Sequence, residues 1–218
     1  MMLTFGSINI LVFKFDHSPD KNKPYILYFR NNYSFPKSWQ MDRIKVLDKT
    51  FEIFITGERI EKRIAELSSQ MEDDLKGEDI VFLAILNGSF MFAAELLKNF
   101  SLPCRLSFLK LFSYSGTEST GRVKELIGLN EDIRGKAVVV IEDIVDTGTT
   151  LCRIVCDLKK KSASSIKVVT LLLKPDAFEG DFSPDYTGFE IPNDFVVGYG
   201  LDYDGFGRNL DGIFRLVE

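Results

Sequence analysis

The chain of 218 residues carries 27 Lys and Arg against 32 Asp and Glu, a formal net charge of −5. That balance excludes the broad basic footprint with which proteins neutralise nucleic-acid phosphates. No apolar run reaches the roughly 18 to 20 residues of a membrane span, so we expect no membrane partner. The cysteines and the single histidine lack the spacing of a zinc site: Cys104, Cys152, Cys156 and His17. We expect a reducing, cytoplasmic compartment.

The first 40 residues differ in pattern from the rest of the chain. Prolines and an Asn-Asn pair interrupt any regular periodicity there: Pro19, Pro24, Pro36 and Asn31-Asn32. We interpret residues 1–40 as an appended segment and residues 41–218 as one domain, which is long enough to bury a continuous core. Translation from Met41 would leave residues 1–40 out of the native protein. That hypothesis stays open, and the intact mass of the native protein would decide it.

Helices and strands alternate from Gly57 onward. Apolar residues at helical spacing predict a helix over 57–75, with Gly77 after it. A second helix is predicted after Ser89, which could cap it, and a third from the apolar spacing over 151–158. Short apolar runs predict five strands: 80–86, 106–113, 137–141, 166–173 and 195–199. Strands that are apolar on both faces and alternate with helices indicate an α/β fold, a parallel sheet covered by helices on both faces.

The most informative segment is VVVIEDIVDTGTTL, residues 138–151. Its apolar strand leads to Glu142 and Asp143, at the carboxyl end of a parallel strand, where open α/β sheets bind their ligands. Adjacent residues of a strand point to opposite faces. The two acids can therefore bind different parts of one polyol, or share a hydrated Mg²⁺ through water.

Asp146 and a hydroxyl-rich turn, Thr147-Gly148-Thr149-Thr150, follow these acids and lead into a helix. The first N–H groups of a helix have no intrahelical partner and meet its positive end, so a phosphate fits there. Glycine lets the backbone curl around the anion. The spacing and the lysine of a Walker A loop are missing, which argues against ATP hydrolysis. On the pattern alone, a capped helix with surface carboxylates remains an alternative.

This segment resembles the phosphoribosyl pyrophosphate signature of the type I phosphoribosyltransferases. Further segments resemble the hypoxanthine/guanine branch of that family. Leu86-Asn87-Gly88 is similar to its pyrophosphate loop, and Ser113-Tyr114 with Ser119-Thr120-Gly121 to its lid. Residues 188–208 are similar to its base-binding hood. The likeness covers residues 42–218 in the family's order, and implies a parallel-sheet phosphoribosyltransferase core with a small hood formed mainly by residues 175–218.

The resemblance implies purine salvage. The 5-phosphoribosyl group of phosphoribosyl pyrophosphate would be transferred to hypoxanthine, guanine or both, giving the nucleotide and pyrophosphate. Asp146 would be the catalytic base that accepts the proton from purine N7. Glu142 and Asp143 would bind the ribose and, with Asp202, the Mg²⁺ cofactor. The 5-phosphate would be held by four residues of the turn: Thr147, Gly148, Thr149 and Thr150.

The family also implies residues for the purine and for pyrophosphate. Lys174 would donate to the oxygen at purine C6, Phe195 would stack on the ring, and Val196 and Asp202 would complete the purine site. Pyrophosphate would be bound by Asn87 and Gly88, at a turn where the family has a non-proline cis peptide, and by Arg208. The lid residues would close over the site and exclude water: Ser113, Tyr114, Ser119, Thr120 and Gly121.

This sequence departs from the family pattern at two positions. Thr149 stands where a lysine or a larger residue is frequent, and Asn87 where many relatives have Lys or Arg. Two other functions stay open: a regulatory protein that binds the nucleotide or phosphoribosyl pyrophosphate without catalysis, and a transferase that prefers xanthine. The family also implies a homodimer or homotetramer.

Overall fold

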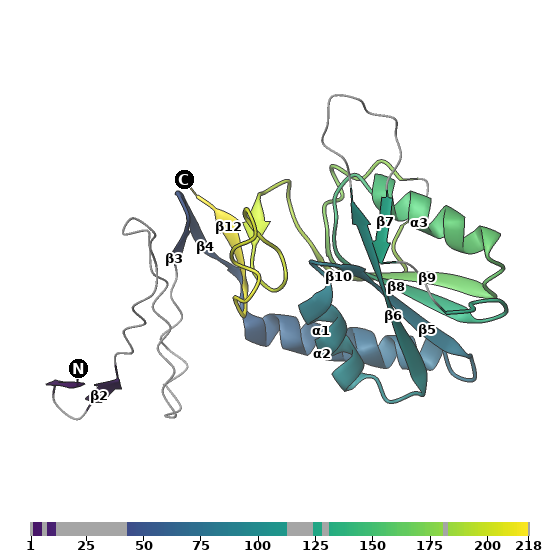
Figure 1. The fold of residues 1–218 in the computed structure, drawn as a ribbon, viewed down its shortest axis with the longest axis horizontal. Coiled ribbons are helices and arrows are strands. Elements are labelled where there is room, and N and C mark those ends of the chain that lie inside the picture. The colour runs from purple at the N-terminus through teal and green to yellow at the C-terminus, as the bar shows by residue number, and fades with distance from the viewer. Residues whose placement is uncertain are drawn as a thin grey trace. The chain divides into compact units, whose positions relative to one another are not determined.

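The computed structural model describes most of the chain (Figure 1): residues 2–5, 8–11, 43–112, 124–127, 131–180 and 183–217. The chain divides into two compact units, residues 1–39 and residues 40–218. In the first unit, β1 (Met2–Phe5) pairs antiparallel with β2 (Ile8–Leu11). No helix among the described residues is both long and apolar enough to cross a membrane.

A sheet of six strands forms the centre of the second unit, within the part of the chain that is described. Its order is β10-β9-β8-β5-β6-β7. Five strands are parallel, and β7 at the edge is antiparallel to β6. The bounds of its strands are β5 (Ile80–Leu86), β6 (Cys104–Phe112), β7 (Lys124–Ile127), β8 (Ala137–Val145), β9 (Ser165–Leu173) and β10 (Tyr186–Glu190). The predicted α/β fold with a parallel sheet is therefore confirmed.

The predicted position of the fifth parallel strand is wrong. We predicted the fifth parallel strand at 195–199, but that position is taken by β10, whose sequence YTGFE mixes apolar and polar residues. β10 is an edge strand with only Tyr186 fully buried, so it needs no continuous apolar run. The predicted segment instead supplies β11 (Val196–Val197) to a second sheet.

Helices cover both faces of the main sheet, as Figure 1 shows. α1 (Gly57–Asp74) and α2 (Phe90–Asn99) lie on one face, and α3 (Thr149–Lys160) on the other. Alternate residues of β5 separate the two cores: Phe82 packs with the residues of α1 and α2, whereas Leu83 packs with those of α3. Both side chains are at most 1% exposed, which explains why β5 is apolar throughout.

The first two helices begin differently. Thr56 caps α1, because its hydroxyl accepts a hydrogen bond from the Arg59 amide at 3.4 Å. Ser89 does not cap α2, so that prediction is wrong. Its backbone is already helical, and its buried hydroxyl donates to the Ile85 carbonyl at 2.6 Å instead.

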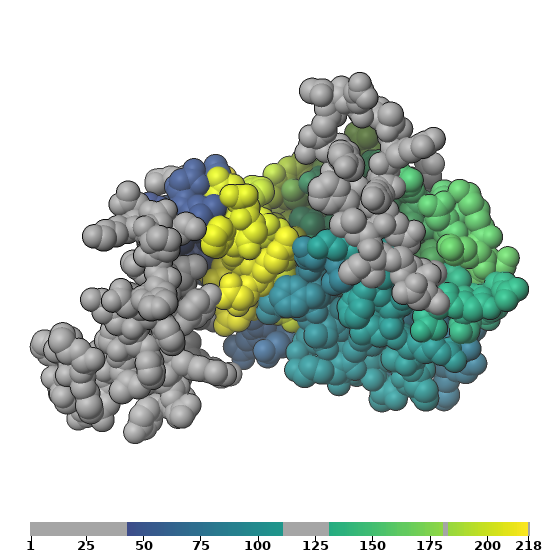
Figure 2. Space-filling view, viewed as in Figure 1, coloured from purple at the N-terminus to yellow at the C-terminus, as the bar shows by residue number. Residues whose placement is uncertain are grey.

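A second, antiparallel sheet, which we call the hood sheet, joins residues from both ends of this unit. Its order is β11-β12-β4-β3, with β3 (Arg43–Val46), β4 (Lys49–Ile55) and β12 (Ile213–Leu216). Figure 2 shows the two segments side by side, blue for β3 and β4 and yellow for the C-terminal part. Its small core contains Val46, Phe51, Val197 and Phe214. Residues 43–55 thus contribute to the hood, which the sequence prediction placed mainly in 175–218.

Candidate active site

β8 carries two acids in the middle of the main sheet. The strand continues through Val145, so Glu142 and Asp143 lie inside it rather than after it. Glu142 pairs with Thr170 of β9, and its side chain is half-buried; Asp143 is 9% exposed. Burial, and then the charge of Asp143, raise the pKa of Glu142 well above its usual value. A cation or hydrogen-bond donors brought by a ligand would stabilise its ionised form.

The Asn87-Gly88 turn lies against Asp143. The peptide bond between Leu86 and Asn87 is cis. A side chain at Gly88 would overlap the Asp143 carboxylate, and a side chain at Gly200, where φ is +103°, would overlap the Gly88 carbonyl. The structure therefore brings the turn predicted to bind pyrophosphate between β8 and the loop after β11, and only glycine fits at these two contacts.

The turn predicted to bind phosphate leads directly into α3. Gly148 is the residue before the helix, with φ +79°, and the amide of Thr149, the first residue of α3, donates to the Thr147 hydroxyl at 3.5 Å. Asp146 therefore does not occupy the position that caps α3. The Thr147 and Thr149 hydroxyls lie 3.1 Å apart and are exposed, as is Thr150. Exposed hydroxyls at the N-terminus of a helix form a suitable anion site.

Lys174 and Asp146 form an ion pair across adjacent strands. Lys174 directly follows β9, and its amide donates to the Val145 carbonyl at 3.0 Å, which extends the pairing of β8 and β9. Its Nζ donates to Oδ2 of Asp146 at 3.1 Å. The Lys174 side chain is 12% exposed and that of Asp146 is 54% exposed. A positioned ammonium and an accessible carboxylate thus lie together beside the turn that opens α3.

The purine and pyrophosphate residues predicted near the C-terminus lie in the hood. Phe195 is 45% exposed, while Val196 and Val197 are buried. Arg208 donates through Nη1 to the Gly200 carbonyl at 2.7 Å and pairs through Nη2 with Oδ1 of Asp202 at 2.5 Å. The other carboxylate oxygen of Asp202 accepts from the Gly205 amide at 2.7 Å. Arg208 is therefore fixed to Gly200, the residue that touches the Gly88 carbonyl.

The three predicted metal ligands do not form a preformed cage. Among the described residues there is no group of three or more His, Cys, Asp and Glu side chains that could hold an ion. The two oxygens of Asp202 already have partners in Arg208 and the Gly205 amide. Mg²⁺ is commonly held by one or two carboxylates together with substrate phosphates, and Glu142 with Asp143 fits that arrangement.

The comparisons with known proteins identify the family. The sequence pattern of the phosphoribosyl transferase domain matches residues 53–204. The chain belongs to this family. Two of its relatives are named hypoxanthine-guanine phosphoribosyltransferase. The one from Mycobacterium tuberculosis (strain ATCC 25618 / H37Rv) is 40% identical over 171 residues, which cover 75% of this chain and 85% of the relative. The one from Staphylococcus aureus (strain N315) is 42% identical over 166 residues, which cover 76% of this chain and 93% of the relative.

Solved structures agree with this assignment. The crystal structure of a hypoxanthine-guanine phosphoribosyltransferase from Bacillus anthracis has a TM-score of 0.72 and 39% identity, covering 76% of this chain and 98% of that one. A hypoxanthine phosphoribosyltransferase from Staphylococcus aureus has a TM-score of 0.72 and 41% identity, covering 76% and 91%. The predicted family of this phosphoribosyltransferase is thereby confirmed.

The predicted lid residues lie outside the described residues: Ser113, Tyr114, Ser119, Thr120 and Gly121. The sequence prediction also missed Asp48 and Tyr203. Their side chains form a hydrogen bond, and the Tyr203 ring contacts the ring of Phe195. The alternating sequence of 43–55, with Leu47-Asp48 at its turn, is a hairpin signal that could have revealed the first of them.

Proposed function

We propose that this chain is a hypoxanthine/guanine phosphoribosyltransferase of purine salvage. It would transfer the 5-phosphoribosyl group from phosphoribosyl pyrophosphate to hypoxanthine, guanine or both, giving inosine or guanosine monophosphate and pyrophosphate. The observation that carries the proposal is the contact of Lys174 with Asp146 beside the opening turn of α3. It joins groups suited to a purine with a turn suited to a sugar phosphate. The names of the relatives support the same substrates.

The ion pair matches one edge of a 6-oxopurine. The oxygen at C6 and N7 are neighbours on that edge. Lys174 would donate to the oxygen, which adenine replaces by an amino group that is itself a donor. Asp146 would accept the N7 proton while N9 forms its bond to C1 of the ribose and the bond from C1 to pyrophosphate breaks. Phe195, with almost half of its surface open, would stack on the purine.

The sugar and its phosphates would occupy the other half of the site. The turn Thr147 to Thr150 would bind the 5-phosphate, Glu142 and Asp143 the ribose hydroxyls, and Asn87-Gly88 with Arg208 the pyrophosphate. Mg²⁺ would be held by the two β8 acids, in part through water, and by the substrate. When bound, it supplies positive charge that stabilises the leaving pyrophosphate.

We also propose a domain organisation, an oligomeric state and a compartment for this protein. Residues 41–218 would form the phosphoribosyltransferase domain, with residues 1–40 as an appended segment. A homodimer or homotetramer is supported by large exposed apolar side chains on the α2 side of the sheet: Phe90, Leu106 and Phe108. Free cysteines support a reducing, cytoplasmic compartment: Cys104, Cys152 and Cys156.

Replacing Lys174 by Met tests the purine half of the site, because Met keeps much of the length but cannot donate. We expect wild-type protein to convert hypoxanthine or guanine. In the variant, KM for that base should rise on the order of 10- to 100-fold, the value of a hydrogen bond to a charged group, and the preference over adenine should shrink. KM for phosphoribosyl pyrophosphate should change little. Ultraviolet absorbance with hypoxanthine, guanine, xanthine and adenine measures both effects.

The control is Lys76→Met, which removes an exposed ammonium after α1, away from the site. It should leave all four bases unchanged. A Lys174 variant that keeps the wild-type KM and base preference would remove Lys174 from the purine site.

A further inference from the structure

Tyr203 connects the C-terminal part of the hood to the turn between β3 and β4. Its hydroxyl donates to Oδ1 of Asp48 at 2.9 Å, although the two residues are 155 positions apart in the chain. Asp48 lies in the turn between β3 and β4, and the next residue, Lys49, places its ammonium 5.5 Å from the centre of the Tyr203 ring. The hydrogen bond lowers the pKa of Asp48 and raises that of Tyr203, which widens the pH range over which the bond is present.

The Tyr203 ring also packs on Phe195. Their centres are 5.8 Å apart and their planes are almost perpendicular, at 86°. Phe51, which is fully buried in β4, is 6.2 Å from Phe195 and 6.4 Å from Tyr203. Phe195 is thus held by two aromatic neighbours from different parts of the chain, and almost half of its surface is exposed. Aromatic contacts of this kind prefer defined angles, so they restrict the orientation of the Phe195 ring.

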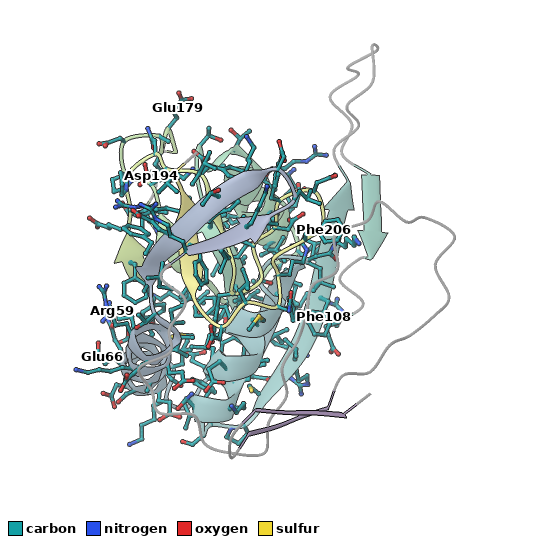
Figure 3. The ribbon with its side chains drawn as sticks, turned by 90° about the vertical axis from the view of Figure 1, so that its left-hand side faces the viewer. Arg59, Glu66, Phe108, Glu179, Asp194 and Phe206 are labelled. Atoms are coloured by element: carbon teal, nitrogen blue, oxygen red, sulfur yellow. The ribbon has the colours of Figure 1, made fainter. Side chains whose placement is uncertain are left out.

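The backbone at Tyr203 is fixed as well. Its amide and carbonyl exchange hydrogen bonds with Phe206 at 2.9 and 3.0 Å. Asp202, the residue before it, pairs with Arg208. Figure 3 shows the β3–β4 hairpin crossing the hood between the labelled Asp194 and Phe206. The main chain of Tyr203 is thus held by Phe206, and its side chain is held separately by Asp48.

We propose that Tyr203, held by Asp48, is a positioning residue that orients the Phe195 ring for purine stacking. The inference rests on the proposed function, in which Phe195 contacts the base. It assigns control of base affinity to a turn that carries none of the residues proposed to bind substrate. Tyr203 would not touch the reacting atoms, so its removal would weaken purine binding and spare the chemical step.

Two single variants remove the hydrogen bond. Tyr203→Phe keeps the ring but lacks the hydroxyl, and Asp48→Ala lacks the acceptor. We expect either change to raise KM for the purine about 3- to 10-fold, less than the roughly 10- to 100-fold value of a direct hydrogen bond to a charged group, because this bond acts on the purine only through the Phe195 ring. Both kcat and KM for phosphoribosyl pyrophosphate should stay within about twofold of wild type. The double variant should be no worse than either single one, because both remove the same bond. Asp48→Asn keeps an acceptor oxygen and should behave like wild type.

The chain offers a matched control in Tyr186. Its hydroxyl donates to Asp74 at 2.8 Å, a bond of the same kind that ties β10 to α1. Tyr186→Phe should lower the urea midpoint of unfolding and leave the purine KM unchanged.

Steady-state kinetics with both substrates varied separates the outcomes. Unchanged purine KM in Tyr203→Phe and Asp48→Ala, with wild-type turnover intact, would overturn the positioning role alone. A fall in kcat together with an equal rise in both KM values would show that the bond serves only the fold. Wild-type protein that turns over no purine would overturn the proposed function, and this inference with it.

Discussion

Asp146→Asn should lower kcat by about 10²- to 10⁴-fold, the usual contribution of a positioned general base. Asn has nearly the same shape and can still accept a hydrogen bond from Lys174, but it cannot take the N7 proton. The dissociation constant of phosphoribosyl pyrophosphate should change far less than kcat. Steady-state kinetics and titration calorimetry measure the two quantities on the same protein.

A matched control is Asp157→Asn. Asp157 is an exposed carboxylate on α3 that pairs with Lys160 at 2.8 Å, so the same chemical change is made away from the turn. Its kcat should match wild type. Equal losses of turnover and of phosphoribosyl pyrophosphate binding in Asp146→Asn would assign Asp146 to binding or folding instead of proton transfer.

Gly148→Ala should destabilise the protein by about 2 to 5 kcal/mol and weaken binding of phosphoribosyl pyrophosphate. Left-handed backbone costs a residue with Cβ about 1 to 2 kcal/mol, and an added methyl in a filled space costs about 1 to 3 kcal/mol. Both conditions hold here, because φ is +79° and the new methyl would overlap the Phe178 ring. The phosphate turn must then shift. Urea unfolding and titration calorimetry measure the two effects.

Gly135→Ala separates strain from overlap. Gly135 has a similar φ of +69°, but a methyl there would meet nothing within 4 Å. Its variant should lose only about 1 to 2 kcal/mol, the cost of the backbone, and bind phosphoribosyl pyrophosphate normally. If the two alanine variants proved equally stable, the Phe178 contact would not explain why glycine is needed at 148.

The elements that were predicted well bury their side chains by a local rule. β5 was predicted with the bounds that it has, because both of its faces are covered and the run is continuously apolar. α1 was predicted to within one residue, since Ile60, Ile64, Leu67 and Met71 form one fully buried stripe. In both cases the burial of each residue follows from its neighbours in sequence.

The hood sheet could not be predicted in the same way. β11 has two residues, and β12 has four that pair with β4 at the other end of the unit. Arg215 and Glu52, which pair across these strands at 2.7 Å, are 163 positions apart. Short strands that are buried only after such distant partners meet carry little periodicity of their own.

The same distinction applies to the residues of the site. The acids of β8 and the turn into α3 are contiguous, so one segment of sequence predicted them together. The contact of Lys174 with Asp146 depends on β8 and β9 being neighbours, and that of Tyr203 with Asp48 on the hood sheet. The spacing of these residues along the chain predicts neither contact. Sequence resemblance placed Lys174 in the purine site, but the distance to Asp146 needed the fold.

The most direct test of the proposed transferase function is product formation by the full chain from hypoxanthine and phosphoribosyl pyrophosphate in the presence of Mg²⁺. Nucleotide and pyrophosphate are both quantified. We expect inosine monophosphate and pyrophosphate in equal amounts, and neither in the absence of protein. Tight binding of phosphoribosyl pyrophosphate with no nucleotide formed from hypoxanthine, guanine or xanthine would contradict it and favour a regulatory protein.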